Sequence, residues 1–267
     1  MRENKLLQKL KENRVALGYA NSFPHPGAVE YGCQGWDFIW ICSQHGYYDY
    51  ESTYHCMMAA ELNGVATVVR VPGHEPGYIG RIMDLAPSAI MVPFVNNAEQ
   101  AEIIAKTTFF PPLGARLYGG VRSMTLHGGN YFEQKHTLVI AQIETEEAVR
   151  NAEGIVSAPG IDMLFFSADD MRMSMAIPVD TAVEQSPLLA GYMQRVGKAC
   201  RDCGKLAGIV AVSDTLTQMA IDAGFTSIVS AGDRFFLGRS RPYSEELRVK
   251  VKGFIDHKGG VNNGKIY

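Results

Sequence analysis

Short apolar runs alternate with helix-like segments along nearly the whole chain, and this alternation constrains the fold more than any other feature of the sequence. Eight runs can be distinguished, and each is largely apolar instead of alternating with polar residues. A strand of this kind is buried on both faces, which is typical of a parallel sheet covered by helices. The eight runs cover residues 15–20, 38–41, 66–71, 89–92, 138–141, 163–166, 206–210 and 227–229.

The segments between the runs have helical character. We expect helices over 50–62, 78–85, 98–107, 145–155 and 214–223, and a mainly helical tail over 235–255 that Pro242 breaks. This order favours a closed TIM (β/α)₈ barrel, formed as a single domain over residues 1–267, because such barrels commonly have about 250 residues. A doubly wound open sheet is the alternative, but no G-x-G-x-x-G follows the first strand and no P-loop motif occurs.

Composition and charge argue against several classes of partner. A net charge of −3 gives no reason to expect nucleic acid or an anionic membrane. The N-terminal segment MRENKLLQKLKENR is charged and amphipathic, unlike a signal peptide, and no window approaches the roughly 20 apolar residues of a membrane span. Five scattered cysteines predict reduced thiols in a cytoplasmic protein. Cys200 and Cys203 form a C-x-x-C where Gly204 ends a helical segment, which favours a plain helix end over a metal or redox site.

Carboxylates stand at or just past the ends of two successive strands. Glu144 follows the run at 138–141, and Asp170 follows the run at 163–166. Because the carboxyl ends of parallel strands meet at one face, we expect the two side chains to lie close together. Oxygen ligands suit a hard divalent cation, so the pair predicts a metal site. The alternative is that each acid caps the helix that follows its strand.

Other polar residues follow neighbouring strands. His45 lies just past the second strand and can act as an acid or base near neutral pH, although a lone histidine is more often a hydrogen-bonding scaffold residue. Arg70 lies at the end of the third strand, where its charge requires an acid or an anionic substrate. Gln142 lies near the end of the fifth strand. Asp84 lies late in the helix after the third strand and, on the sequence alone, is a solvated residue.

Two connections are unusually long, over residues 109–134 and 171–186. Loops of this length in a compact domain are often functional. The alternative is a surface excursion or a contact between subunits.

Together these residues suit chemistry on a 2-oxo acid. A cation held by Glu144 and Asp170 would chelate the keto and carboxylate oxygens and stabilise an enolate. Arg70 would hold the developing oxyanion charge, and His45 would move the proton while a C–C bond is cleaved or formed. Gln142 would add a polar contact.

Several segments also match a known family. They are VVRVP at 68–72, MVPFV at 91–95 with NAE at 97–99, FPPLGAR at 110–116 and QIET at 142–145. Through these segments the chain resembles the HpcH/HpaI family of metal-dependent (class II) pyruvate aldolases, from Ala16 to the last strand. The resemblance implies a TIM barrel, a divalent metal cation (Mg²⁺, Mn²⁺ or Co²⁺), and a homohexamer whose C-terminal helix is exchanged between subunits. It also implies cleavage of 4-hydroxy-2-oxo acids to pyruvate and an aldehyde.

Carried over residue by residue, the resemblance implies a complete catalytic set. Asp84 would raise the basicity of the catalytic histidine, whereas on the sequence alone we interpret Asp84 as a solvated helix residue. The implied set is His45, Arg70 and Asp84 for catalysis, Arg70, Gln142 and the backbone amide of Asp169 for substrate binding, and Glu144 and Asp170 for the metal.

The chain departs from the family pattern at two places. Members read Asp-x-Glu-His where this chain has Cys42, Ser43, Gln44 and His45, and Gly-Pro-Ala-Asp-Leu-Ser where residues 167–172 read SADDMR. Without the acid, His45 should be less basic, because a nearby carboxylate favours the protonated imidazole. These departures keep two alternatives open. One is a related 2-oxo acid decarboxylase or carboligase with an unusual acceptor, and the other is a non-catalytic paralogue that binds a 2-oxo acid.

Overall fold

Eight parallel strands close into a single barrel in this computed structural model, which describes residues 3–12, 15–133 and 135–257. Each strand pairs with the next along the chain, and the last pairs with the first. The expected closed barrel is therefore confirmed, and the open sheet is excluded. The strands are β1 (Ala16–Asn21), β2 (Phe38–Cys42), β3 (Ala66–Arg70), β4 (Ala89–Val92), β5 (Leu138–Ile143), β6 (Met163–Phe166), β7 (Leu206–Val210) and β8 (Ser227–Gly232).

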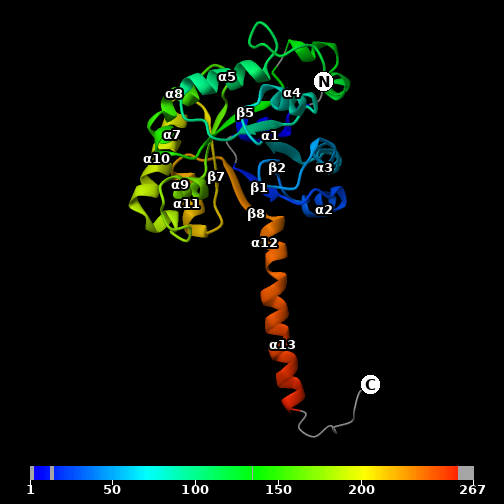
Figure 1. Cartoon of the computed structure of the whole chain (residues 1–267), viewed down its shortest axis with the longest axis vertical. Helices are drawn as coiled ribbons and strands as arrows, with labels where there is room; N and C mark the ends of the chain where they lie inside the picture. The colour runs from blue at the N-terminus through cyan, green and yellow to red at the C-terminus, as the bar shows by residue number, and fades with distance from the viewer. Residues whose placement is uncertain (1–2, 13–14, 134, 258–267) are drawn as a thin grey trace.

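Helices follow the strands and surround the barrel (Figure 1). Side-chain caps fix where several of them begin, since Asp49, Asn97 and Ser213 each accept a hydrogen bond from a backbone N–H in the first turn. The helices are α1 (Lys5–Lys11), α2 (Pro26–Gly32), α3 (Tyr50–Leu62), α4 (Pro76–Asp84), α5 (Ala98–Thr108), α6 (Val121–His127), η1 (Gly129–Phe132), α7 (Glu146–Arg150), α8 (Ala152–Ser157), α9 (Ala168–Ser174), η2 (Val183–Gln185), α10 (Pro187–Asp202), α11 (Asp214–Asp222), α12 (Asp233–Gly238) and α13 (Ser240–His257).

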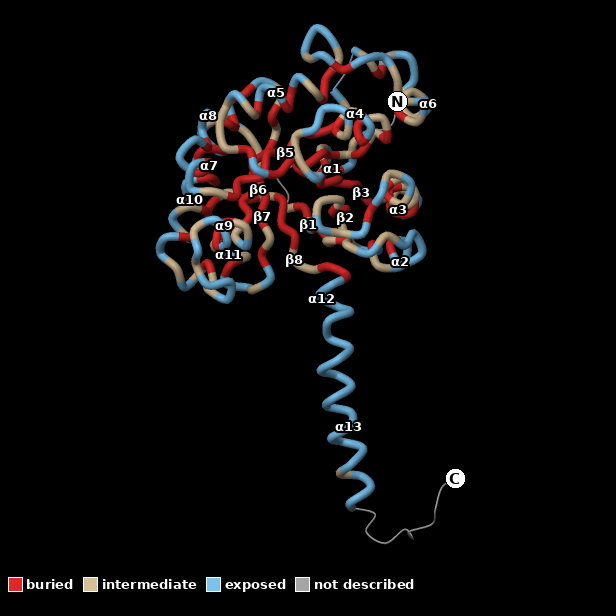
Figure 2. The backbone as a smooth tube through the Cα atoms, viewed as in Figure 1, coloured by how far each residue is buried: buried red, intermediate tan, exposed pale blue. Residues whose placement is uncertain are grey.

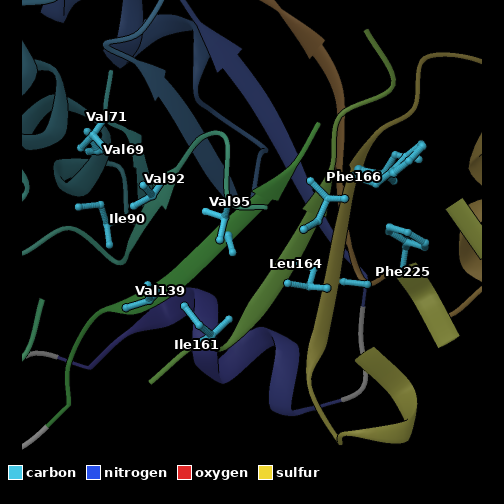
Figure 3. Close-up of a cluster of buried hydrophobic side chains, with 14 of the residues drawn as sticks. Val69, Val71, Ile90, Val92, Val95, Val139, Ile161, Leu164, Phe166 and Phe225 are labelled. Atoms are coloured by element: carbon cyan, nitrogen blue, oxygen red, sulfur yellow. The ribbon is translucent and has the colours of Figure 1, made fainter. Parts of the chain in front are cut away.

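Alternate residues of each strand build two separate apolar layers. One set points outward and packs under the helices, as the labelled Val69, Ile90, Val139 and Leu164 do in Figure 3. The other set points into the barrel, because successive side chains of a strand lie on opposite faces. The inner layer comprises Phe38, Trp40, Ala66, Val68, Ala89, Met91, Leu138, Ile140, Met163, Phe165 and Val229, with Ala16 from the first strand.

The short helix α1 closes the amino end of the barrel. Leu6 and Leu10 are buried in the same inner cluster as the strand residues. Asn4 caps α1 and also donates hydrogen bonds to the carbonyl oxygens of Ser88 and His136, at distances of 2.7 and 2.8 Å. The interior is thus a packed core that leaves only the carboxyl end of the barrel available for a site.

The two long connections lie at opposite ends of the barrel. Residues 109–134, of which 134 is outside the described part of the chain, join a helix to the start of β5 and contain α6 and η1. Residues 171–186 follow β6 and include the end of α9 and η2. Within one chain, only the connection over residues 171–186 lies at the carboxyl ends of the strands, where a site is expected.

The C-terminal helix α13 extends away from the barrel and is exposed along its length (Figure 2). The expectation that Pro242 breaks the tail was wrong. The break lies at Arg239, between α12 and α13, and Pro242 lies in the first turn of α13. A proline is tolerated there because the first N–H groups of a helix have no partner within the helix.

The C-x-x-C segment is a helix end, as expected. Cys203 is the C-cap of α10, and Gly204 follows with a φ of 62°. Burial raises the pKa of the Cys200 thiol to about 12, so this sulfur is neutral at physiological pH. All five cysteines are free. No helix in the described part of the chain is long and apolar enough to cross a membrane.

Candidate active site

On three strands, the side chains that point into the barrel are apolar until the carboxyl end, where the last one is polar or a cysteine. Cys42, Arg70 and Gln142 each lie two residues beyond an inner-core residue of the same strand, so strand periodicity places them inside the carboxyl end of the barrel. Continuing the same period past β5 and β6 gives Glu144 and Ser167. The candidate site is therefore the topmost layer of the barrel interior.

Arg70 is buried and its guanidinium contacts three side chains. Its Nη2 donates to Cys42 Sγ at 2.9 Å, and its Nη1 lies 3.5 Å from Gln142 Oε1. Its Cζ lies 4.7 Å from the centre of the Trp40 ring, which is a cation–π contact. The sulfur of Cys42, the amide of Gln142 and the ring of Trp40 therefore fix the orientation of the guanidinium.

Gln142 and Asp170 extend this chain of contacts to β6. Gln142 Nε2 lies 3.5 Å from Asp170 Oδ2, and the Ser167 hydroxyl donates to the same oxygen at 2.6 Å. Asp170 is in the first turn of α9, whose N-cap residue is Ser167. Asp170 is thus not the cap of this helix.

Glu144 is almost completely buried, with 1% of its surface exposed. Its Oε2 accepts a hydrogen bond from the backbone N–H of Phe94, whose φ of 55° is uncommon for a residue with a side chain. Its Oε1 has no hydrogen-bond partner among the described residues. Burial, together with the nearby Asp170 carboxylate, raises the pKa of Glu144 to about 8. The cap of α7 is Thr145, so the capping alternative is wrong for Glu144 too.

These carboxylates fit a divalent cation. Two carboxylates lie close together, and one buried oxygen has no partner in the part of the chain that the structure describes. Each feature is unfavourable unless a positive charge is present. No group of three or more His, Cys, Asp and Glu side chains in the described residues could hold a metal. A cation here would therefore take two protein carboxylates, and substrate or water oxygens would complete its shell, as is common for Mg²⁺.

A cleft with a volume of about 580 Å³ opens over this layer. His45 lies on its wall in the turn after β2, and the His45 backbone N–H donates to Cys42 Sγ at 3.3 Å. Arg70, Asp169 and Asp170 line the same cleft. The expected histidine, arginine and acids are therefore brought together.

Asp84 does not lie in the cleft with His45, Arg70 and Asp170 of the same chain. It is the last residue of α4, a helix that returns the chain toward the amino end of the barrel, and it forms an ion pair with Arg116. Asp84 is absent from the residues that line the cleft. Its implied action on His45 stays a prediction.

Asp169 occupies the cleft in a different way from Asp170. Its carboxylate is largely exposed and pairs with Arg172 at 2.6 Å. Arg172 in turn donates to the carbonyl oxygen of Thr181, at 2.7 Å. The charges that distinguish this segment from the family pattern therefore neutralise each other. The binding role implied for the Asp169 amide stays a prediction.

Three residues that contact the site residues or line the cleft were not predicted from the sequence. Phe94 acts through its backbone, which leaves no signal in residue type. Ser167 lies directly after β6 and could have been noted as a hydroxyl at a strand end. Arg234 follows β8, but that strand was expected to end at 229 and extends to Gly232. A correct strand end would have revealed Arg234 as a charge at the cleft.

Comparison with known proteins places the chain in a family. The model of the HpcH/HpaI aldolase/citrate lyase family matches residues 19–232, which is most of the chain. The chain belongs to the HpcH/HpaI aldolase/citrate lyase family.

Two curated aldolases are similar to this chain over most of their length. The chain is 32% identical to a 4-hydroxy-2-oxovalerate aldolase of Novosphingobium aromaticivorans, with 87% of this chain and 89% of that protein covered. It is 28% identical to a 2-dehydro-3,6-dideoxy-6-sulfogluconate aldolase of Pseudomonas putida, over 91% and 95% of the two chains. A solved HpcH/HpaI family structure from Burkholderia cenocepacia J2315 superposes with a TM-score of 0.82 at 26% identity, covering 92% of this chain and 99% of that one.

Proposed function

We propose that this protein is a divalent-metal-dependent class II pyruvate aldolase, which cleaves or forms 4-hydroxy-2-oxo acids. The observation that carries the proposal is that the Glu144 and Asp170 carboxylates lie close together and that one buried oxygen of Glu144 has no hydrogen-bond partner among the described residues. Family membership and the aldolase activities named for its relatives support the same reaction class.

A cation held by Glu144 and Asp170 would act as a Lewis acid that stabilises the negative charge developing on the 2-oxo group. The residues around it bind and orient the substrate. Arg70 has its guanidinium in the cleft and would stabilise the oxyanion as the C3–C4 bond breaks. Gln142, hydrogen-bonded to both Arg70 and Asp170, would hold these two groups in register and contact the substrate. The Asp169 amide would meet the carboxylate of pyruvate.

His45 would move the proton. In the cleavage direction it accepts the proton of the C4 hydroxyl, directly or through a water, while the C3–C4 electron pair moves onto C3. The C4 fragment leaves as an aldehyde. Within the described residues, no hydrogen bond or ion pair joins the His45 ring to a carboxylate. Cys42 occupies the neighbouring position, and Asp84 pairs with Arg116. An effect of Asp84 on His45 would have to come from another subunit.

We also propose that the protein is a homo-oligomer, a hexamer in the arrangement that the family resemblance implies. Apolar side chains are exposed on α13, which makes few contacts with its own barrel. Tyr243, Leu247, Val251 and Phe254 recur at helical spacing and form a stripe that we call the α13 stripe. An exposed stripe of this kind indicates a protein–protein contact, and exchange of this helix between subunits would bury it.

The function is tested by pyruvate release from a 4-hydroxy-2-oxo acid, measured with a coupled lactate dehydrogenase assay. Activity should require a divalent cation and should be lost in Glu144→Ala and in Asp170→Ala. Glu146→Ala is the matched control, because Glu146 lies two residues away on the exposed face of α7. Activity that survives EDTA and both substitutions would refute the proposal. Oxaloacetate decarboxylation, measured beside a panel of aldehydes, separates an aldolase from a dedicated decarboxylase.

A further inference from the structure

We propose that Asp233, Asn21 and Tyr48 position His45 for its proton transfer. The three side chains form a continuous line of hydrogen bonds, which we call the Asp233 network. The network holds one end of the turn that carries His45, residues 43–48, which we call the His45 turn. The inference rests on the proposed aldolase function and extends it to residues that act through His45 and not on the substrate.

Asp233 lines the cleft, but both of its carboxylate oxygens are already engaged. Asp233 is buried, and its Oδ2 accepts hydrogen bonds from Asn21 Nδ2 and from the backbone N–H groups of Ser22 and Phe23, at 2.7–2.9 Å. Its Oδ1 accepts from the backbone N–H of Arg234, at 2.7 Å. A carboxylate with these donors is suited to hold them in place, because hydrogen bonds to an ionised acceptor are strong. Asp233 therefore ties the end of β1 to the start of α12.

Asn21 links Asp233 to Tyr48. Asn21 is buried, its Nδ2 donates to Asp233, and its Oδ1 accepts from the Tyr48 hydroxyl. Because an ionised carboxylate can only accept hydrogen bonds, the amide nitrogen faces Asp233 and the amide oxygen faces Tyr48. Burial raises the pKa of the Tyr48 hydroxyl, so this group keeps its proton and donates. The hydrogen bonds of the network thus run in one direction, from Tyr48 through Asn21 to Asp233.

The start of the His45 turn is fixed by the neighbouring strand β3. The backbone N–H of Ser43 donates to the carbonyl oxygen of Arg70 at 2.9 Å, which extends the pairing of β2 with β3 by one more hydrogen bond. The backbone N–H of His45 donates to Cys42 Sγ at 3.3 Å. These contacts locate the residues up to His45.

The end of the His45 turn is fixed by the Asp233 network. The backbone N–H of Tyr47 donates to the carbonyl oxygen of Ser22 at 3.1 Å, and the Ser22 N–H is one of the donors to Asp233. The turn lies close against this segment, since a Cβ at Gly46 would lie 3.0 Å from the same Ser22 oxygen. Tyr48, the last residue of the turn, adds its hydroxyl to the network. The place of the histidine on the wall of the cleft therefore depends on the network.

Proton transfer is sensitive to such positioning. A general base must lie within hydrogen-bond reach of the proton that it accepts, and a displacement of about 1 Å can lower a rate roughly a hundredfold. Aldol cleavage needs this base, because the proton of the C4 hydroxyl passes to His45 while the C3–C4 bond breaks and its electron pair moves onto C3.

Decarboxylation of oxaloacetate in the same cleft does not need the base. The C3–C4 electron pair stays on C3, C4 leaves as carbon dioxide, and the enolate then takes a proton from water. No proton has to be removed from the substrate. The two reactions therefore share the cation and Arg70 and differ in their need for His45.

The test is the ratio of aldol cleavage to oxaloacetate decarboxylation, both measured as kcat with the same divalent cation. Tyr48→Phe keeps the ring and removes the hydroxyl, which leaves the buried Asn21 oxygen without this donor. Its ratio should fall roughly tenfold, the usual size of such a loss, while decarboxylation keeps the wild-type rate. Asp233→Asn should lower the ratio further, because an amide offers one acceptor oxygen in place of two. Tyr47→Phe is the matched control, since Tyr47 is an exposed tyrosine of the same turn, and it should keep the wild-type ratio.

A double-mutant cycle shows whether the network acts through the histidine. Tyr48→Phe should have no further effect on cleavage in a His45→Ala background, because the base that the network positions is absent. A hydroxyl that only stabilised the fold would lower cleavage by the same factor in both backgrounds.

The inference would be overturned if Tyr48→Phe lowered both reactions equally or neither, or if its effect persisted in the His45→Ala background. Tyr48→Phe decides the test if Asp233→Asn fails to fold. These outcomes leave the proposed function intact, because the wild-type protein still cleaves its substrate. A wild-type protein that does not cleave a 4-hydroxy-2-oxo acid with any divalent cation would refute the proposed function, and the inference with it.

Discussion

Cys42 supplies the sulfur that orients the buried arginine of the site. Arg70 donates to Cys42 Sγ at 2.9 Å, and the His45 backbone N–H donates to the same atom at 3.3 Å. One sulfur atom thus joins the arginine and the turn that carries the histidine. An acid would form an ion pair with Arg70, whereas the thiol fixes its direction without that pairing, so the guanidinium charge stays available to an oxyanion.

Removing this sulfur should reduce turnover. In Cys42→Ala the guanidinium loses an acceptor, and we expect kcat to fall by about tenfold, which is a typical effect of one hydrogen bond to a charged group. Cys42→Ser keeps an acceptor and should recover most of the loss. The affinity for the divalent cation, measured by calorimetry, should not change, since Cys42 contacts neither carboxylate. Equal kcat values in the alanine variant and the wild type would contradict this role for Cys42.

The raised pKa of Glu144 gives the metal-free protein a defined pH dependence. Burial raises this pKa from 4.5 to about 8, so Glu144 is protonated in the folded state over a range in which it is ionised in the unfolded state. The stability that this proton contributes is fully present below pH 4.5 and is lost as the pH rises through about 8. Because the cation must displace the proton, its affinity should increase over the same range.

This pH dependence can be measured by thermal unfolding in EDTA and by metal titration across that range. Glu144→Gln is neutral and close in shape, so it should flatten the contribution of Glu144 to the pH dependence of stability. It should also bind the cation weakly at every pH. A Glu144→Gln variant with the same pH slope as the wild type would show that this carboxyl does not titrate in the range.

At the scale of elements, the inward-pointing side chains of a strand are apolar along most of its length and become polar at its carboxyl end, where the candidate site lies. Room inside the barrel is limited. A Cβ at Gly18 in β1 would lie 2.3 Å from the ring of Phe38, which is itself buried. The glycine therefore provides the space that this ring fills.

Two glycine substitutions should act in opposite directions. Gly18→Ala should destabilise the protein by about 1–3 kcal/mol, because Phe38 cannot move without disturbing the core. Gly80→Ala lies within α4, where a Cβ would meet nothing within 4 Å, and should stabilise by roughly 0.4–1 kcal/mol through a better helix propensity. Denaturant unfolding measures both. A neutral Gly18→Ala would indicate that the barrel interior is less tightly packed than the structure shows.

Strands that are apolar along their whole length could be predicted from the sequence. Segments whose structure depends on pairing or packing with other elements could not. β4 and β6 were placed at their observed ends, since their whole length is apolar. β8 was placed too short because Ser230, Ala231 and Gly232 are small residues whose strand structure depends on pairing with β1. Helix α2 was missed because its seven residues include two glycines, although it buries Val29.

For the site, strand ends identified Arg70, Gln142, Glu144 and Asp170 correctly as neighbours, because parallel strands bring these positions to one face. Sequence could not give the contacts that orient them, which involve the backbone of Phe94 and the sulfur of Cys42. It placed Asp84 late in the helix after the third strand, where it lies, but not in an ion pair with Arg116. The structure puts Asp84 in an ion pair at a helix end, away from the cleft.

At the scale of the whole molecule, α13 needs a partner. Its exposed apolar residues would be buried if the helix packed on another subunit (Figure 2). Val251→Glu places a charge in the α13 stripe and should lower the molecular mass measured by light scattering during gel filtration. Val249→Glu, on a different face of the same helix, should leave the mass unchanged. A monomeric wild type, or a Val251→Glu variant with the full mass, would contradict the proposed assembly.

The central claim is that the two carboxylates hold a cation which makes the methyl group of pyruvate acidic. Exchange of the pyruvate methyl protons in deuterated water, followed by NMR, tests this without any assumption about the aldehyde. We expect exchange by the wild-type protein with Mg²⁺, Mn²⁺ or Co²⁺, none in EDTA, and none in Glu144→Gln or Asp170→Asn with any of the three cations. Cation and pyruvate binding without exchange would identify a non-catalytic binding protein, and exchange that persists in EDTA and in both variants would contradict the metal site itself.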